Sequence, residues 1–222
     1  MALSLPDAAI TAIDLSSASL AYAIRMARQY AVSNIEFVQM DLRNVKGLGI
    51  EFDFVQSSGV LHHLEDPAEG WERLVEVLRP RGLMRIGLYS ELARQRIATA
   101  QIRARESRLS MRAFRQELLR ERDNPESGEL LLFPEFYSAS GCRDLLFHVQ
   151  ERRYRLPQIR DFLARHNLAF LGFLLRDPAV FQQFEASFPR AAATDLDAWD
   201  AFENIHPQTF RHLYCFYSQK SD

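Results

Sequence analysis

The sequence predicts an α/β protein built on a parallel sheet. Three short apolar runs, at residues 10–13, 35–40 and 52–57, have the length and composition of buried strands. Amphipathic helical patterns follow the first and the third run, and the connecting segments are short. Strands that alternate with helices in this way typically pair in parallel, with the helices packed on the sheet.

The N-terminal 42 residues are predicted to contain two strands and one helix. Residues 1–6 are interpreted as the end of a helix and its exit loop, and the first strand follows at Ile10–Ile13. Ser16 suits the N-cap of a helix that extends to about Tyr30, because its apolar residues recur at helical spacing. Ile35–Met40 is the second strand.

The stretch Phe52–Pro67, FDFVQSSGVLHHLEDP, is the most informative part of the chain. Its strand ends at Ser57-Ser58-Gly59, small residues that let the backbone turn and let a ligand come close. Asp66 and Pro67 are the types preferred at the N-cap and first position of a helix, which is predicted to end near Leu78. Ligands of open α/β sheets bind at the carboxyl ends of such strands.

The next segments are assigned from breakers and periodicity. Residues 43–51 and 124–127 are predicted loops, residues 79–82 are predicted to end the preceding helix, and residues 83–89 form the next strand. Residues 91–121 are predicted to be helical and rich in arginine, which favours a solvated face with glutamate partners. An electropositive rim for an acidic substrate or an RNA is the alternative, but no aromatic residues are interleaved with the arginines.

The remaining residues continue the α/β pattern, and the chain shows no internal repeat. Residues 133–148 are rich in aromatic side chains, with a helix predicted from Ser140. Further helices are predicted at residues 156–166, 177–188 and 195–205, and further strands at residues 168–175 and 213–217.

The composition indicates a globular protein. At 222 residues, 47% hydrophobic and 25% charged, the chain suits one domain with a modest additional segment. A net charge of −2 does not favour nucleic acid or an anionic membrane as a partner. No apolar run approaches the roughly 20 residues of a membrane-spanning helix. Residues 1–5 do not resemble a signal peptide. Cys142 and Cys215 lie far apart, which favours a reducing, cytoplasmic location.

Three segments together resemble the class I S-adenosylmethionine-dependent methyltransferases of small molecules. ITAIDL, IEFVQMDL and the Phe52–Pro67 stretch match the second, third and fourth strands of that family, in order and spacing, over Ala8–Ser90. The resemblance implies a Rossmann-like, doubly wound, mostly parallel sheet with an antiparallel last strand. It divides the chain into a core at residues 1–90, a helical insertion or lid at residues 91–150, and the rest of the core at residues 151–222.

The resemblance also implies a site for S-adenosyl-L-methionine. Asp14, at the end of the second strand, is expected to accept hydrogen bonds from both ribose hydroxyls, although a helix-capping role is the alternative. Asp41, at the end of the third strand, is expected to accept from the adenine amino group, and a solvated loop aspartate is the alternative. The full set of expected cofactor-binding residues is Asp14, Leu15, Asp41, Leu42, Ser57 and Ser58.

Candidates on the side of the methyl acceptor, which the sequence does not identify, are His62, His63 and Tyr89. A neutral imidazole could take a proton from the acceptor. A metal held by the histidines with Glu65 and Asp66 is not expected, because sequence neighbours point in different directions. No catalytic residue is required, since methyl transfer depends mainly on positioning the reactants in a dry pocket.

One part of the family pattern is missing. Its first strand ends in a glycine-rich loop, but residues 1–13 contain no glycine. That strand is central, so its loss should leave open sheet edges and unpaired backbone groups. We expect the chain to be part of a longer protein; a degenerate protein, or a second chain or swapped copy that supplies the strand, are the alternatives.

The functional hypothesis is a methyltransferase domain that is a fragment of a longer protein. The alternative is a catalytically inactive, methyltransferase-like interaction module. A metal-dependent hydrolase built on His62 and His63 is a distant third hypothesis, which bound metal in the purified protein would support.

Overall fold

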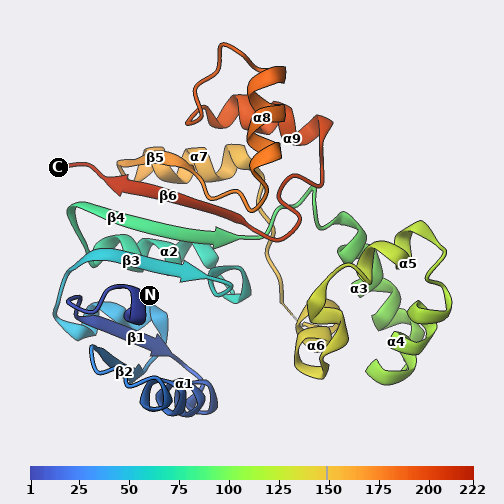
Figure 1. Ribbon diagram of the computed structural model, residues 1–222, viewed down its shortest axis with the longest axis horizontal. Coiled ribbons are helices and arrows are strands. Elements are labelled where there is room, and N and C mark those ends of the chain that lie inside the picture. The colour runs from blue at the N-terminus through green and yellow to red at the C-terminus, as the bar shows by residue number, and fades with distance from the viewer. Residues whose placement is uncertain (149) are drawn as a thin grey trace.

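The computed structural model describes residues 1–148 and 150–222, and its strands lie in two sheets. The smaller sheet pairs β1 (Ile10–Asp14) with β2 (Ile35–Gln39) in parallel, so that Asp14 lies opposite Gln39. A short 3₁₀ helix, η1 (Ala2–Ser4), precedes β1. Both strands occupy their predicted positions, and both run in the same direction in Figure 1.

The larger sheet has the order β3–β4–β6–β5. β3 (Phe52–Ser58) is parallel to β4 (Leu78–Leu88), whereas β6 (Tyr214–Lys220) is antiparallel to β4 and to β5 (Leu168–Phe173). The predicted α/β class, with a mostly parallel sheet and an antiparallel last strand, is therefore confirmed.

The two sheets are separated where the central strand was predicted to be missing. β1 lies next to β3 in Figure 1, yet no pairing between them occurs among the described residues. A narrow cavity of about 90 Å³ lies between them, lined by Thr11 and Ile13 on one side and by Phe52, Phe54 and Val55 on the other. The predicted open edges are thus present on β1 and on β3.

Helices cover these sheets through apolar faces. α1 (Ser17–Gln29) packs on the smaller sheet, and α2 (Pro67–Glu76) and α7 (Leu156–Arg165) lie together behind the larger one in Figure 1. Trp71 of α2 stacks on Phe162 of α7, with ring centroids 3.8 Å apart. Such large buried rings contribute strongly to stability. Truncating one of them to alanine typically lowers the free energy of unfolding by about 3–5 kcal/mol.

The last two helices form an aromatic layer at the far end of the larger sheet. α8 (Pro178–Ser187) and α9 (Leu196–Ile205) contact each other through Phe184 and Trp199, whose rings stack at 3.8 Å. Asp177 caps α8 and Asp195 caps α9, each by accepting from backbone N–H groups of the first turn. All predicted C-terminal elements are present.

Two predictions near the first sheet were wrong. Residues 43–51, predicted to be a loop, contain the 3₁₀ helix η2 (Leu42–Leu48), because the side chain of Asp41 caps its first turn. Residues 79–82, predicted to end a helix, lie within β4. Leu78 pairs with Phe52 but Leu83 pairs with Phe54, so these residues form a bulge inside the strand.

Two predictions in the insertion also required correction. Residues 91–121 form two helices rather than one, α3 (Gln95–Ser107) and α4 (Met111–Arg120), because Arg108 adopts a left-handed conformation with φ of 54° and Ser110 caps the second helix. Residues 124–127, predicted to be a loop, begin α5 (Pro125–Leu130), with Asn124 as its N-cap.

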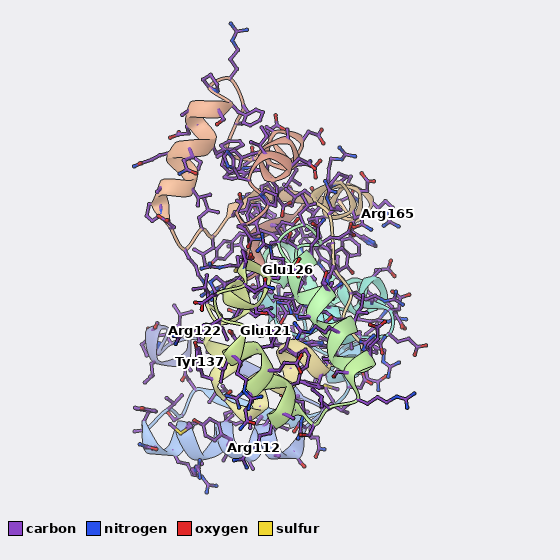
Figure 2. All side chains as sticks on the ribbon, turned by 90° about the vertical axis from the view of Figure 1, so that its right-hand side faces the viewer. Arg112, Glu121, Arg122, Glu126, Tyr137 and Arg165 are labelled. Atoms are coloured by element: carbon purple, nitrogen blue, oxygen red, sulfur yellow. The ribbon has the colours of Figure 1, made fainter. Side chains whose placement is uncertain are left out.

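The segment predicted to be a helical insertion, called the insertion below, also contains η4 (Pro134–Tyr137) and α6 (Ala139–Phe147). Its helices α3 to α6 lie beside the sheets in Figure 1 and have their own apolar core. Phe114, Phe136 and other fully buried residues form a cluster separate from the core of the larger sheet. Figure 2 shows the outer side of the insertion, with labelled residues Arg112, Glu121, Arg122, Glu126 and Tyr137.

Charges of both signs pair on this outer surface. Arg103 of α3 forms ion pairs with Glu117 and Glu121, and Arg96 pairs with Glu129 at 2.9 Å. The predicted solvated face with glutamate partners is therefore confirmed. Separately, none of the helices that the structure describes combines the length and the apolar character required to span a membrane.

Candidate functional site

A cavity of about 1020 Å³ lies at the carboxyl ends of β1, β2 and β3. This is the edge of a parallel sheet at which α/β proteins bind ligands. Six of the residues around it are those that the sequence predicted for a cofactor, namely Asp14, Leu15, Asp41, Leu42, Ser57 and Ser58. The structure thus brings together residues that are up to 44 positions apart in the chain.

Asp14 ends β1 and leaves one carboxylate oxygen available. Its Oδ1 accepts from the backbone N–H of Ser16 at 2.8 Å, while the Oγ of Ser16 accepts from Ser19 and caps α1. The capping role that competed for Asp14 thus belongs to Ser16. Within the described part of the chain, Asp14 Oδ2 has no hydrogen-bond partner, so it can accept from a hydroxyl group of a ligand.

Asp41 is engaged by a neighbour that the sequence analysis overlooked. Arg43 donates through its backbone N–H to Asp41 Oδ1 at 2.9 Å and through Nη2 to Oδ2 at 2.6 Å. These hydrogen bonds, the side-chain ones first, hold the pKa of Asp41 below its usual range. Asp41 is therefore an ionised, locally paired aspartate at the rim of the cavity, and a ligand would share it with Arg43.

The end of β3 presents a buried hydroxyl to the cavity. Ser57 is buried, and its Oγ has no hydrogen-bond partner among the residues that the structure describes. Unsatisfied buried hydroxyls are uncommon, so a ligand in this cavity is a natural partner. The next residue, Ser58, lies against Gly87 of β4, where a Cβ atom would approach Ser58 Oγ to 2.5 Å. Only glycine allows these two strands to pair so closely here.

His62 and His63 follow in a short 3₁₀ helix, η3 (Leu61–His63), and have different environments. His62 is fully buried and stacks on Tyr89 at 3.7 Å. Burial, and then the nearby charges, lower the pKa of His62 to about 3, so the ring is neutral. His63 is half-buried, lines the large cavity and faces Asp144 of α6.

Tyr89 lies between the sheet and the insertion. Its ring is covered on one side by His62 and contacts the guanidinium of Arg94, which lies 3.5 Å from the ring centroid. A cavity of about 110 Å³ next to it is also lined by Asp144, Arg176 and His212. Of the three predicted acceptor-side residues, His63 and Tyr89 therefore line cavities, and His62 packs between them.

A buried ion pair joins the insertion to the core. Arg94 Nη2 lies 2.8 Å from Glu151 Oε2, and both side chains are only 3% exposed. Arg153 and Gln101 complete the network around the same carboxylate. Sequence reasoning missed this pair, because Arg94 is one of many arginines in its segment and 57 positions separate it from its partner.

The sequence of the chain is similar to a family of known domains and to an uncharacterized protein. The family described as "Methyltransferase domain" matches residues 1–84. An uncharacterized protein of Synechococcus sp., syc1184_c, is 34% identical over 186 residues, which cover 78% of this chain and 44% of that protein. The chain therefore spans less than half the length of this relative.

Solved structures share the fold at low sequence identity. PKMT2 from Rickettsia typhi superposes with a TM-score of 0.69 at 14% identity, covering 98% of this chain and 44% of PKMT2. Its complex with AdoHcy gives a TM-score of 0.65. The [4+2]-cyclase SpnF gives 0.51 at 15% identity, covering 99% of this chain and 70% of SpnF. Residues 1–84 therefore match a methyltransferase domain, and the chain as a whole shares the fold of these solved structures.

Proposed function

We propose that this chain forms most of a methyltransferase domain that uses S-adenosyl-L-methionine and belongs to a longer protein. One observation carries the proposal: the cavity at the carboxyl ends of β1, β2 and β3 is lined by all six predicted residues. Two polar atoms in it, Asp14 Oδ2 and Ser57 Oγ, lack partners among the described residues and suit a ribose and the polar end of a ligand.

The bound cofactor would supply a methyl group on a sulfonium, which is a good leaving group. The protein residues then have mainly to bind and orient. Asp14 would accept from the ribose hydroxyls, Leu42 would contact the purine ring, and the small Ser58 would leave room for the methionine portion. His63 lines the same cavity and can accept a proton from a methyl acceptor.

We further propose that polypeptide outside these 222 residues supplies a strand between β1 and β3. Each of these strands leaves an edge unpaired among the described residues, and apolar side chains of both line the gap. A strand that enters this gap would end beside Asp14 and Ser57, where a glycine-rich turn could complete the cavity. The greater length of the similar proteins supports this source.

The two cysteines support a reducing, cytoplasmic setting for this domain. Cys142 is buried in the insertion, Cys215 lies in β6, and both are free thiols. Free cysteines are typical of compartments that keep thiols reduced.

The test is a calorimetric titration of S-adenosylhomocysteine into two proteins. One is this chain, and the other carries an N-terminal extension that supplies a strand and a glycine-rich loop. We expect saturable binding to the extended protein, weakened at least ~10-fold by Asp14→Ala, since a charge-assisted pair of hydrogen bonds is lost. Asp53→Ala, an exposed aspartate at the start of β3, is the matched control and should leave the affinity unchanged.

Other outcomes distinguish the alternatives. Binding to the unextended chain, together with a dimeric mass in solution, would show that a second copy completes the cavity. A folded, extended protein without measurable affinity would contradict the proposal and support a catalytically inactive interaction module. One observation favours that second candidate, namely the bidentate pairing of Asp41 with Arg43.

A further inference from the structure

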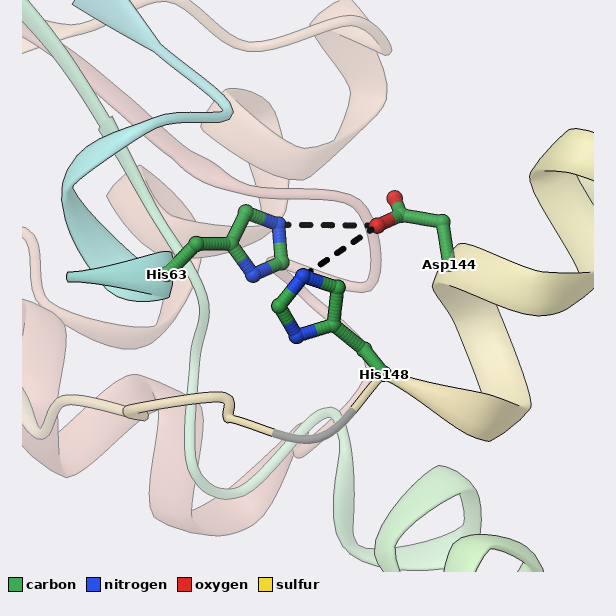
Figure 3. A group of neighbouring side chains, drawn as sticks. All are labelled: His63, Asp144 and His148. Atoms are coloured by element: carbon green, nitrogen blue, oxygen red, sulfur yellow. Dashed lines mark ion pairs between the residues drawn. The ribbon is translucent and has the colours of Figure 1, made fainter. Parts of the chain in front are cut away.

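Three potential metal ligands meet between the sheet and the insertion. His63 comes from η3 at the end of β3, whereas Asp144 and His148 lie one helical turn apart at the end of α6. Figure 3 shows a ring nitrogen of each histidine directed at the same carboxylate oxygen. His63 Nε2 is 3.7 Å and His148 Nε2 is 4.0 Å from Asp144 Oδ1, and all three ligand atoms lie within 4.8 Å of one another.

We propose that His63, Asp144 and His148 bind a divalent first-row transition metal ion that fastens the insertion to the core. Two imidazoles and one carboxylate are the donor set preferred by Zn²⁺, Co²⁺ and Ni²⁺ rather than by Mg²⁺ or Ca²⁺. Three protein ligands leave a further coordination position for water or a small ligand. This proposal does not depend on the methyltransferase function.

The spacing is close to that of an occupied site. A tetrahedral ion with bonds of about 2.0–2.2 Å holds its ligand atoms roughly 3.3–3.6 Å apart. The two distances to Asp144 Oδ1, 3.7 Å from His63 and 4.0 Å from His148, lie just above this range. The side chain of Asp144 is 49% exposed, so it can rotate toward the ion without disturbing the core.

The hydrogen bonds around His63 prepare it for coordination. Its Nδ1 lies 3.2 Å from the carbonyl oxygen of Gln150, and a carbonyl only accepts, so Nδ1 carries the proton. The lone pair of Nε2 then faces Asp144 and His148. A backbone carbonyl that fixes the tautomer in this way is a common partner of histidines that bind metals.

His148 requires one local change. Its Nδ1 accepts from the backbone N–H of Gln150 at 3.1 Å, which places the proton of the neutral ring on Nε2. Coordination through Nε2 moves that proton to Nδ1, so the bond from the Gln150 amide must break. Metal binding is therefore expected to increase the hydrogen-exchange rate of this amide.

The surrounding charges leave the site accessible to a cation. Of the nearby arginines, Arg94 is neutralised by Glu151, and Arg105 donates to the backbone carbonyl of His148 at 3.3 Å. Arg152 and Arg176 line the adjacent cavities but are exposed to solvent. Asp144 is therefore the charge closest to the two imidazoles, and its attraction for a divalent ion is not opposed by a buried cation.

The experiment titrates ZnCl₂ and CoCl₂, and MgCl₂ as a control, into the purified chain without a histidine tag. We expect one equivalent of Zn²⁺ or Co²⁺ to bind and Mg²⁺ not to bind. The variants His63→Ala, Asp144→Ala and His148→Ala should each weaken the affinity at least ~10-fold. The matched control is His206→Ala, an exposed histidine after α9, which should bind as the wild type does.

A second measurement tests whether the bound metal ion holds the insertion to the core. Zn²⁺ should slow proteolysis between the insertion and α7 in the wild type and in His206→Ala, but not in His148→Ala. The proposal is overturned if Zn²⁺ and Co²⁺ show no saturable binding, or if the three variants retain wild-type affinity. Circular dichroism of each variant before titration separates lost ligation from lost folding.

Discussion

The helical insertion and the sheet core differ in how completely their backbone N–H and C=O groups are hydrogen-bonded within each region. α3–α6 make their backbone hydrogen bonds within each helix and bury Phe114 and Phe136 in a cluster of their own. A strand instead makes its backbone hydrogen bonds with neighbouring strands, and β1 and β3 lie next to each other without pairing among the described residues. The contrast teaches that a helix completes its backbone hydrogen bonds by itself, whereas a strand depends on its neighbours and leaves an open edge where no neighbour pairs with it.

The largest expected effects test whether the two regions are separate cooperative units. Trp71→Ala in the core and Phe114→Ala in the insertion should each cost about 3–5 kcal/mol of local stability, since both rings are fully buried. Hydrogen exchange should show lost protection in β3, β4 and β6 for the first variant and only in α3–α6 for the second. Equal loss in both regions for Phe114→Ala would show that they unfold together.

The ion pair between Arg94 and Glu151 tests how firmly the regions are joined. Burial acts to raise the pKa of Glu151, but the hydrogen bond and charge of Arg94 hold it below its usual range. Glu151→Gln leaves a buried guanidinium without its counter-charge and should cost about 3–5 kcal/mol in urea unfolding. Arg103→Met, which removes a half-exposed pair, should cost less than about 1 kcal/mol.

A double variant sharpens this test. Arg94→Met with Glu151→Met should lose less stability than the sum of the single variants, because it leaves no unpaired buried charge. Additive losses would mean that the two side chains act independently of each other.

Buried Glu203 of α9 gives the stability of the core a dependence on pH. Burial is the largest cause that raises the pKa of this carboxyl to about 7 from 4.5, while Ser90 and Tyr214 donate hydrogen bonds to it. The folded state therefore holds the proton more tightly than the unfolded chain. Its stabilising contribution is complete below about pH 4.5 and is lost as the pH rises through about 7.

The size of this loss is roughly 3 kcal/mol. Urea unfolding of the wild type should show lower stability at pH 8 than at pH 5, and Glu203→Gln should remove most of this difference. An unchanged pH dependence in the variant would contradict the assignment to Glu203. Hydrogen exchange within α3–α6 should remain insensitive to this substitution once corrected for intrinsic rates.

The smallest expected effect separates capping from ligand binding at the end of β1. Ser16→Ala removes the N-cap of α1 and should cost about 1 kcal/mol. Asp14→Ala should cost less stability while weakening the binding of S-adenosylhomocysteine to the extended protein. If Asp14→Ala lost more stability than Ser16→Ala in thermal unfolding, Asp14 rather than Ser16 would be the residue that caps α1.

Local sequence patterns were sufficient to predict most of the helices and strands and several of the residues that line the candidate site. Asp14, Asp41 and Ser57 were predicted from the resemblance to methyltransferases, at the ends of apolar runs, and the carboxyl ends of parallel strands meet at one edge of a sheet. The predictions failed at residues 43–51, 79–82 and near Arg108, where a side-chain cap, a bulge and a left-handed residue decide the backbone. Such features depend on pairing and packing rather than on periodicity.

By itself, the sequence determined the order of most strands and helices, the resemblance to methyltransferases and the absence of a glycine-rich loop from the first 13 residues. These features are encoded in adjacent residues and their spacing. Only the tertiary structure decided which polar residues meet. It buried His62, exposed a nitrogen of His63 to Asp144 and His148, and paired Arg94 with Glu151. These partners come from different elements, and contacts between such elements are set by the packing of the whole core.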